Sequence, residues 1–417
     1  MNAQKEWPKR RLDELTEPAR PITYGVVKPG DHDDLNGVRF IRGGDIAEGK
    51  INISNLRTIT SEVSAGYKRT LLRGGEVVVS LVGNPGEAAV VPASLAGANI
   101  ARQTGLVALR DDVDSRYVMY FLRSPGGRAE LFAQTTGSVQ QVINLANLKN
   151  IRVPLPDLTT QRKIAGILST YDDLIENNLR RIKILEQMAQ SLYREWFVHF
   201  RFPGHESAQL SESPLGRVPK GWASLFGEHV DYKEGPGLRK WQYRKEGIPF
   251  LNIRTLGDND IDLTSAQYLD PVEVETKYQH FLLDKFDHVV SSSGTIGRVV
   301  TVREAHLPLM LNTSIIRMRP NGSRVGLWQL KHFLISEGFQ NQAIAFATGA
   351  AQPNFGPSHL KQMTIIAPPE SLSKAYERLA TPLEEAIHSL IATSQNLRRT
   401  RDLLLPKLLQ NDSYLNL

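Results

Sequence analysis

Two stretches of the chain carry an apolar stripe at alternating spacings of four and three residues. In the first stretch the stripe positions are Ile164, Leu168, Tyr171, Ile175, Asn178, Ile182, Leu185, Ala189, Leu192 and Trp196. In the second they are Ala380, Leu383, Ile387, Leu390, Ser394, Leu397, Arg401, Leu404 and Leu408. This alternation is typical of a coiled-coil seam and predicts two long helices, the first from about residue 161 to 198. Because Pro382 lacks a backbone donor, we expect a short helical lead-in and a kink before the second long segment.

Neither predicted helix can bury its apolar stripe alone, and each is the obvious partner of the other. Each stripe is interrupted by polar residues, Asn178 in the first and Ser394 with Arg401 in the second. Polar residues in a coiled-coil seam commonly fix register and orientation. If both helices leave their domains in the same way, they form an antiparallel pair with a domain at each end. The alternative is that each stripe packs against its own domain as ordinary core.

The segments before the two helices repeat one another at a nearly constant offset. Gly137 precedes Gly349 by 212 residues, and the same offset aligns Pro156 with Pro368. A constant offset predicts repeated architecture, and this period is too long for a solenoid. We therefore divide the chain into domain 1 (1–156), a first helical segment (157–205), domain 2 (206–370) and a second helical segment (371–417).

The two domains share a pattern of short β-type runs, glycine-rich turns and helices. The runs at 76–80 and 287–291 each lead into a turn, which we interpret as a hairpin because it lacks the Lys-Ser/Thr pair of a phosphate-binding loop. Helices are expected at about 117–122 and 328–333. The predicted fold class is α+β, with two α/β domains separated by two long antiparallel coiled-coil helices in a pseudo-two-fold internal repeat.

Composition indicates a globular protein of a reducing compartment. Hydrophobic residues make up 41% of the 417 positions, and cysteine is absent, which excludes disulfides, thiolate catalysis and cysteine-ligated metals. No apolar run is long enough to span a bilayer, and the N-terminal residues lack the apolar core of a signal peptide. We therefore expect no membrane partner and a cytoplasmic location.

The net charge of +6 is spread unevenly between the domains. Domain 1 has 20 basic against 16 acidic residues, whereas domain 2 has 17 of each. Basic residues cluster locally, at 9–11, at Arg239-Lys240 and at Arg244-Lys245. Such clusters can bind phosphates, although a solvated surface is the common alternative.

Two amide-rich loops offer chemistry for reading DNA, whereas catalytic patterns are missing. The loops at 136–141 and 348–354 contain Gln and Asn, which pair bidentately with adenine. The sequence has no Asn-Pro-Pro-aromatic element, no helicase-type phosphate loop and no His-x-x-x-His spacing. Loose nuclease-like carboxylate patterns at 45–50 and 270–277 are expected by chance. The chain is therefore predicted to have no catalytic site of its own.

Three segments resemble the specificity (S) subunits of type I restriction–modification systems. They are residues 154–178 (PLPDLTTQRKIAGILSTYDDLIENN), 192–204 (LYREWFVHFRFPG) and 399–409 (RTRDLLLPKLL). The resemblance covers essentially the whole chain, and the helix with its Trp-Phe-x-x-Phe segment is highly specific. The second copy departs from the pattern, because residues 371–376 lack the Gln-x-x-Ile of Gln161 to Ile164.

The resemblance implies a non-catalytic DNA-recognition subunit. In this family two target-recognition domains each read one half of a split DNA sequence and are held apart by antiparallel helices. The implied partners are double-stranded DNA and two modification subunits, which methylate adenine N6 with S-adenosylmethionine. Two restriction subunits, which use ATP and Mg²⁺, are a further option, and no cofactor is expected in this chain. Because the two domains differ in sequence, we expect an asymmetric target.

The candidate site residues are polar side chains on the loops and on the first helix. The candidate base-reading residues are Arg42, Gln103, Gln140, Gln141, Asn144, Arg254, Asn312, Gln352, Asn354 and Lys361. The candidate subunit interface is the helix face outside the seam, with Asp172, Asp173, Glu176, Arg180 and Arg181. In both sets the alternative is an ordinary solvated surface.

Two other classes of protein compete with this interpretation. A nuclease or a self-contained methyltransferase would turn over DNA without partners, whereas a recognition subunit alone would not. A coiled-coil scaffold without a nucleic-acid role would show no salt-dependent DNA binding in its complex.

Overall fold

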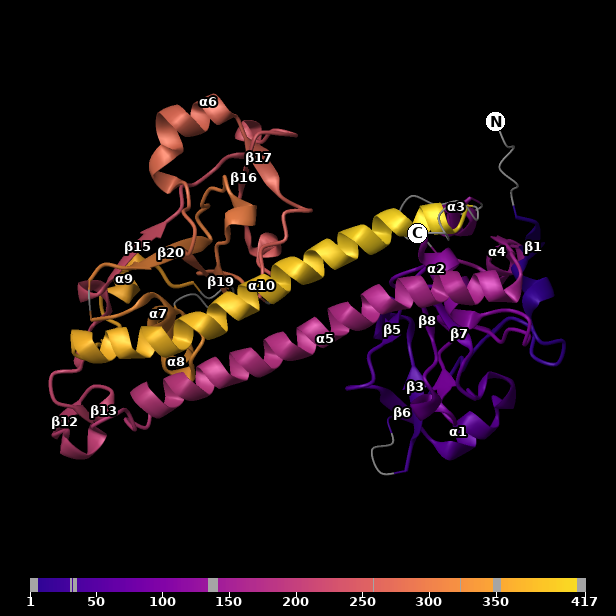
Figure 1. The fold of residues 1–417 in the computed structure, drawn as a ribbon, viewed down its shortest axis with the longest axis horizontal. Coiled ribbons are helices and arrows are strands. Elements are labelled where there is room, and N and C mark those ends of the chain that lie inside the picture. The colour runs from indigo at the N-terminus through magenta and orange to yellow at the C-terminus, as the bar shows by residue number, and fades with distance from the viewer. Residues whose placement is uncertain are drawn as a thin grey trace. The chain divides into compact units, whose positions relative to one another are not determined.

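The computed structural model describes residues 7–30, 32, 36–133, 142–257, 259–322, 324–347 and 354–410. The chain divides into two compact units, Met1–Asn177 with Thr393–Leu417, and Asn178–Ala392. This division cuts both long helices, α5 (Leu158–Phe197) and α10 (Glu370–Leu408), so each unit contains one part of each helix (Figure 1). The domain limits set out above follow the predicted helix ends and remain predictions.

The first unit is built on a four-stranded antiparallel sheet in the order β2-β10-β7-β8. The central strand β7 is buried along its whole length, so both faces of this sheet are covered. A second sheet has the order β6-β3-β9. The strands are β1 (Lys9–Arg11), β2 (Thr23–Tyr24), β3 (Val38–Ile41), β4 (Ile46–Ala47), β5 (Lys50–Ile51), β6 (Arg57–Ile59), β7 (Val77–Ser80), β8 (Ala88–Val90), β9 (Asn99–Ile100), β10 (Thr104–Val107) and β11 (Arg152–Pro154). The short helices are α1 (Ser61–Ala65), α2 (Ser115–Arg123), α3 (Pro125–Phe132) and α4 (Leu145–Asn150).

The second unit has a four-stranded antiparallel sheet in the order β15-β20-β18-β19, which repeats the strand order of the first. The strands are β12 (Leu210–Ser213), β13 (Gly216–Pro219), β14 (Ala223–Leu225), β15 (Val230–Glu234), β16 (Ile248–Phe250), β17 (Gln267–Leu269), β18 (His288–Ser291), β19 (Val299–Thr301), β20 (Ile315–Pro320) and β21 (Thr364–Ile366). The helices are α6 (Pro271–Glu273), α7 (Leu327–Leu334), α8 (Glu337–Phe346) and α9 (Pro357–Leu360).

The predicted fold class is confirmed, and so are the local elements on which it was based. The two β-type runs are β7 and β18, and the two short helices are α2 and α7. The glycine-rich turns join β7 to β8 and β18 to β19, as hairpins. In the first turn Gly83 and Gly86 have φ values of +91° and +89°, a region that glycine adopts without steric cost.

The two long helices pack against each other in an antiparallel sense within each unit. In the first unit Ile164 and Leu168 of α5 share a core with Leu405 and Leu408 of α10. In the second unit Ile182 of α5 packs with Ile387 and Leu390 of α10. The seam of α5 also joins the domain cores, because Ile164 contacts the cluster that contains α2 and β7. Each apolar stripe therefore packs against the other long helix along part of its length and against a domain core along another part.

The second long helix passes through Pro382 without a break. α10 continues from Glu370 to Leu408 as one helix, so the helical residues before Pro382 are continuous with the long segment, and the expected kink stays a prediction. Pro382 and Arg378 are both exposed. The carbonyl of Arg378 loses its helical donor at Pro382 but can still bond water, which makes the interruption tolerable.

The joints between each domain and its long helix repeat at the predicted offset of 212 residues. The Tyr117 hydroxyl donates to the Pro154 carbonyl at 2.6 Å, and the Gln329 amide donates to the Ile366 carbonyl at 2.8 Å. Each bond connects the first helix after the sheet to the last strand before the long helix. Equivalent positions thus make equivalent bonds, although the side chains differ.

Candidate nucleic-acid interface

In the first unit the predicted base-reading residues converge on the turn after β7. The Leu81 N–H donates to the Gln103 carbonyl at 2.8 Å, and the Ile143 N–H donates to the Leu81 carbonyl at 3.0 Å. Gly43 lies against this turn, because a Cβ at that position would come within 2.6 Å of the Ser80 hydroxyl. The backbone therefore brings together the neighbourhoods of Arg42, Gln103 and Asn144, which lie far apart in the sequence.

The side chains near this turn differ in their exposure and in whether they already have hydrogen-bond partners. Gln103 is exposed. Arg42 is 45% exposed and pairs with Asp45 at 2.9 Å; this hydrogen bond raises the pKa of the Arg42 guanidinium. Asn144 caps α4 by accepting from the Asn147 N–H at 2.8 Å. Arg42 and Asn144 therefore already have local partners, whereas the Gln103 amide is open to solvent.

The second unit shows the same convergence after β18. The Ser292 N–H donates to the Ser314 carbonyl at 2.9 Å, and the Phe355 N–H donates to the Ser292 carbonyl at 3.0 Å. Ser293 and Asn354 form an isolated β-bridge. The Ser292 hydroxyl is buried and has no hydrogen-bond partner among the residues described. A buried hydroxyl of this kind is unusual, since most are satisfied.

The other candidate base-reading residues of domain 2 differ in their exposure and in their contacts with the turn after β18. Arg254 is exposed, and its neighbour Ile253 would contact a Cβ at Gly294 of the turn at 3.0 Å. The Asn312 side chain accepts from the Thr313 N–H at 2.7 Å, and Asn354 is exposed. Lys361 is exposed at the end of α9 and makes no bond from its side chain to the turn. Gln140, Gln141 and Gln352 lie outside the described residues.

The candidate subunit interface on α5 is only partly exposed. Asp173, Arg180 and Arg181 are exposed, as expected. Glu176 is partly buried and accepts from Lys50 of β5. Asp172 does not lie on the outer face: its carboxylate accepts from the Tyr120 hydroxyl at 2.5 Å and from Arg401 of α10 at 2.5 Å. Asp172 is mostly buried because α2 and α10 both pack against α5 at this point, and its place in the subunit interface stays a prediction.

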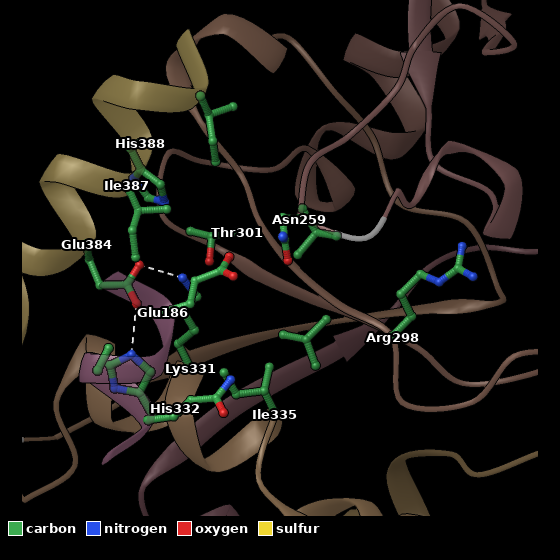
Figure 2. A pocket seen from close by; sticks show the side chains of 15 residues that line it. Glu186, Asn259, Arg298, Thr301, Lys331, His332, Ile335, Glu384, Ile387 and His388 are labelled. Atoms are coloured by element: carbon green, nitrogen blue, oxygen red, sulfur yellow. Dashed lines mark hydrogen bonds and ion pairs between the residues drawn. The ribbon is translucent and has the colours of Figure 1, made fainter. Parts of the chain in front are cut away.

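A buried polar cluster in the second unit was not predicted. Figure 2 shows Glu384 of α10 directed toward Lys331 and His332 of α7, beside a cavity of about 290 Å³. Glu384 is 1% exposed, accepts from His332 at 2.8 Å and forms an ion pair with Lys331. The His332 ring also bonds the Tyr376 hydroxyl at 2.7 Å. This cluster corresponds to the Asp172 joint, since residues 120 and 172 lie 212 positions before 332 and 384.

Electrostatics explain why the cluster can hold a buried charge. Burial acts to raise the pKa of Glu384, but the His332 hydrogen bond and the Lys331 charge outweigh it and hold that pKa at about 2. Burial lowers the pKa of His332, so its imidazole is neutral at pH 7. The described residues contain no group of three or more His, Cys, Asp and Glu side chains that could hold a metal ion. The cluster is therefore a satisfied ion network that joins α7 to α10.

Comparison with known proteins identifies the family. A family model, type I restriction modification DNA specificity domain, matches residues 4–187. The MjaIX specificity subunit of Methanocaldococcus jannaschii is 25% identical over 72% of this chain and 69% of its own length. The EcoBI specificity subunit of Escherichia coli is 31% identical over 44% of this chain and 40% of its own length. The HindI specificity subunit of Haemophilus influenzae is 22% identical over 94% of this chain and 97% of its own length.

A solved structure supports the fold. The S subunit from M. genitalium aligns over 99% of this chain and 98% of its own length, with a TM-score of 0.55 and 17% identity. The chain thus shares the fold of that S subunit, and residues 4–187 match the DNA specificity domain. It belongs to the specificity subunits of type I restriction–modification systems.

Membership settles the class of activity. Specificity subunits are a family without catalytic activity of their own, and the cofactors of the complex belong to the partner subunits. DNA target recognition is therefore the function of this chain. Among the described residues, no helix has the length and apolarity needed to cross a membrane.

Proposed function

We propose that the chain reads a bipartite, asymmetric DNA target, with domain 1 on one half-site and domain 2 on the other. The proposal rests on one observation: the two domains share the same framework, but their loops differ. The sheet order and the helix joints repeat, whereas the residues around the two turns differ in type and charge. Two readers with different chemistry on one scaffold would recognise two different half-sites, and the paired helices would fix their separation.

Base recognition is assigned to the exposed side chains of the two turn clusters. Gln103, Arg254 and Asn354 are exposed and carry groups suited to the major groove, since amides pair with adenine and guanidinium with guanine. Arg42, Asn144 and Asn312 would first have to leave their local partners. Gln140, Gln141, Gln352 and Lys361 complete the proposed set.

We further infer that α5 and α10 dock two modification subunits in the cytoplasm, with restriction subunits as additional partners. Asp173, Arg180 and Arg181 supply an exposed charged face on α5. Ile184 and Met188, one helical turn apart, are 55% and 52% exposed on the same helix. Exposed apolar side chains rimmed by charge are typical of protein interfaces. Asp172 and Glu176 would support this face through their bonds to α10 and β5.

The proposal is tested by co-expressing the chain with a modification subunit and mapping methylated adenines in genomic DNA. The expected result is a single split motif with two different halves. Replacing residues 1–156 by the corresponding domain of another specificity subunit should change one half and leave the other unchanged. A continuous motif, or a change in both halves after the exchange, would contradict the assignment of one domain to each half-site.

A further inference from the structure

The loop after β15 presents an unusually exposed tryptophan. Trp241 is 74% exposed, whereas Trp196, Trp222 and Trp328 are 5% exposed or less. Tryptophan is normally buried over most of its surface, because its indole loses more by contact with water than smaller side chains do. An indole that stays in water therefore points to a surface that a ligand covers.

The turn that carries Trp241 is firmly anchored. Gln242 is 3% exposed; its amide accepts from the Arg239 N–H at 2.9 Å and donates to Glu273 and Tyr278 at 2.9 and 3.1 Å. On the other side, Arg244 donates to the Trp241 carbonyl at 3.1 Å. The backbone on both sides of Trp241 is thus held by buried or bonded groups, while the indole itself is exposed.

The charges of residues 239–245 are all positive, and Glu246 is the one acidic residue of the loop between β15 and β16. Arg239, Lys240, Arg244 and Lys245 are exposed, and within the described part of the chain none of them forms an ion pair with a carboxylate. Four cations in seven residues create a positive patch that attracts a polyanion. Tryptophan and arginine are common in protein interfaces as well, but lysine is depleted there, and the density of positive charge favours a polyanion.

This patch lies close to the candidate interface of domain 2. Gly235, at the start of the loop, packs so closely against Asn312 that it leaves no room for a side chain. A Cβ on Gly237 would lie 3.9 Å from the Thr313 side chain. Trp241 follows four residues later, a span of about 14 Å at most. The patch can therefore reach the duplex that occupies the turn cluster.

The counterpart loop of domain 1 has the opposite character. Between β2 and β3 the sequence contains Lys28 with Asp31, Asp33 and Asp34, and it has no aromatic residue. Between β15 and β16 it contains four basic residues, one acidic residue and Trp241. A contact that domain 2 alone makes with its half of the target requires such a difference between the two loops.

We propose that residues 239–245 form an additional DNA contact of domain 2, in which the Trp241 indole stacks on a base at a deformed step and the four cations bind flanking phosphates. Aromatic side chains at unstacked base steps and cations on phosphates are the usual elements of such contacts. This inference rests on the proposed reading of DNA by domain 2. It adds a contact outside the turn cluster and assigns it to one half-site only.

The test uses the full chain assembled with its modification subunits and a duplex that carries the mapped target. Trp241→Ala should weaken DNA binding roughly tenfold, as expected for one lost stacking contact. Trp241→Phe should retain most of the affinity, whereas Trp241→Leu should not, because leucine keeps apolar area without an aromatic face. Placing 2-aminopurine along the domain 2 half-site should locate one position whose fluorescence changes between the wild-type and Trp241→Ala complexes.

The cationic part is tested by salt dependence. Replacing Lys240 and Lys245 together by Gln should reduce the slope of log affinity against log salt by about 1.8, since each phosphate contact contributes about 0.9. The matched control is Arg217→Gln, an exposed arginine of β13 that pairs with Glu212 and should leave the slope unchanged.

The outcomes separate this inference from the proposed function. If Trp241→Ala binds DNA within about twofold of the wild type, against the loss expected for a stacked base, the contact does not exist. If the variant fails to assemble with the modification subunits, the patch is a protein-docking surface, which also overturns the inference. In both cases a split methylation motif in the wild type would leave the proposed function standing.

Discussion

The two joints between domain and helix use one framework with different chemistry. In the first unit, Asp172 of α5 accepts from Tyr120 of α2 and pairs with Arg401, which comes from the opposite long helix. In the second, Glu384 of α10 takes both partners, Lys331 and His332, from α7 of its own domain. The carboxylate position is repeated, but only the first joint has an ion pair between the two helices.

This difference shows how a duplicated scaffold can diverge without losing its geometry. A carboxylate on the long helix needs compensation wherever it is buried, because an unpaired buried charge is strongly destabilising. Either a guanidinium from the partner helix or an ammonium and an imidazole from the domain supplies it. Divergence can therefore alter the partners of the joint while its position in the frame is kept.

The largest expected effect is the loss of the second joint. Glu384→Gln removes the negative charge and one of the two acceptor oxygens that Lys331 and His332 use, at a site where Glu384 is 1% exposed. We expect the second unit to lose about 3–5 kcal/mol of unfolding free energy, as for a broken buried ion pair. Denaturant titration with hydrogen exchange resolved by unit measures this loss. Glu385→Gln, at the exposed neighbouring position, is the control; equal effects of both variants would contradict a buried ion network.

The second effect is a pH dependence confined to the second unit. Burial lowers the pKa of His388 to about 4 and that of His288 to about 3, both below the ordinary value of 6.5. Each folded pKa lies below its unfolded value, so the stability contribution is full above about pH 6.5 and is lost as the pH falls. At pH 5 the loss is about 2 kcal/mol for each histidine.

Hydrogen exchange between pH 7 and 5 checks this dependence. The amides of the second unit should open more readily as the pH falls, and those of the first unit should change little. His388→Leu should remove only part of the effect, because His288 and His332 remain. A decline of both units in parallel would show that the histidines are not its cause.

A smaller loss is expected at the first joint. Asp172 is 14% exposed and Arg401 11%, and Arg401 keeps a second carboxylate in Asp402. Asp172→Asn should therefore destabilise the first unit by about 1–3 kcal/mol, less than Glu384→Gln does the second. Asp173→Asn, an exposed neighbour, should have no measurable effect on the same unfolding curve. A loss as large as that at Glu384 would contradict the expectation that the more exposed joint contributes less to the unfolding free energy.

The smallest effects concern the tethers to the exit strands. Tyr117→Phe removes one hydrogen bond to the Pro154 carbonyl and should cost about 1 kcal/mol. Gln329→Leu removes the matching bond but also removes an amide oxygen that is buried without a partner. Its cost should therefore be smaller. Thermal unfolding of the two variants measures the difference, and a larger loss for Gln329→Leu would show that this oxygen is bonded in solution.

The arrangement of the long helices and the repeated domains could be predicted because periodic patterns in the sequence indicate them. The heptad stripes predicted α5 and α10, and the constant offset predicted a repeated architecture, although not the strand order that the two sheets share. The hairpins followed from valine-rich runs that end at glycine turns. Hydrophobic periodicity and turn chemistry are local signals, so a single sequence contains them.

The bonded partners of individual side chains could not be predicted in the same way. Asp172 flanks the seam, and its position alone does not tell whether a second helix covers it. Glu384 and His332 lie 52 residues apart and share no local motif. The offset of 212 residues was the one usable signal, because it aligns Tyr120 with His332 and Asp172 with Glu384. Likewise, the basic pairs around Trp241 could be read from the sequence. The exposure of its indole could not, because it depends on the bonds of Gln242 to Glu273 and Tyr278.

The exposure of Trp241 also gives the protein an intrinsic optical reporter. An indole in water emits at longer wavelength and is reached first by a soluble quencher such as iodide. The other four tryptophans of the chain are buried or partly buried, so the iodide-sensitive component of the emission arises mainly from position 241. Occupancy of that turn can thus be followed in the unlabelled protein, in real time and while the rest of the complex assembles.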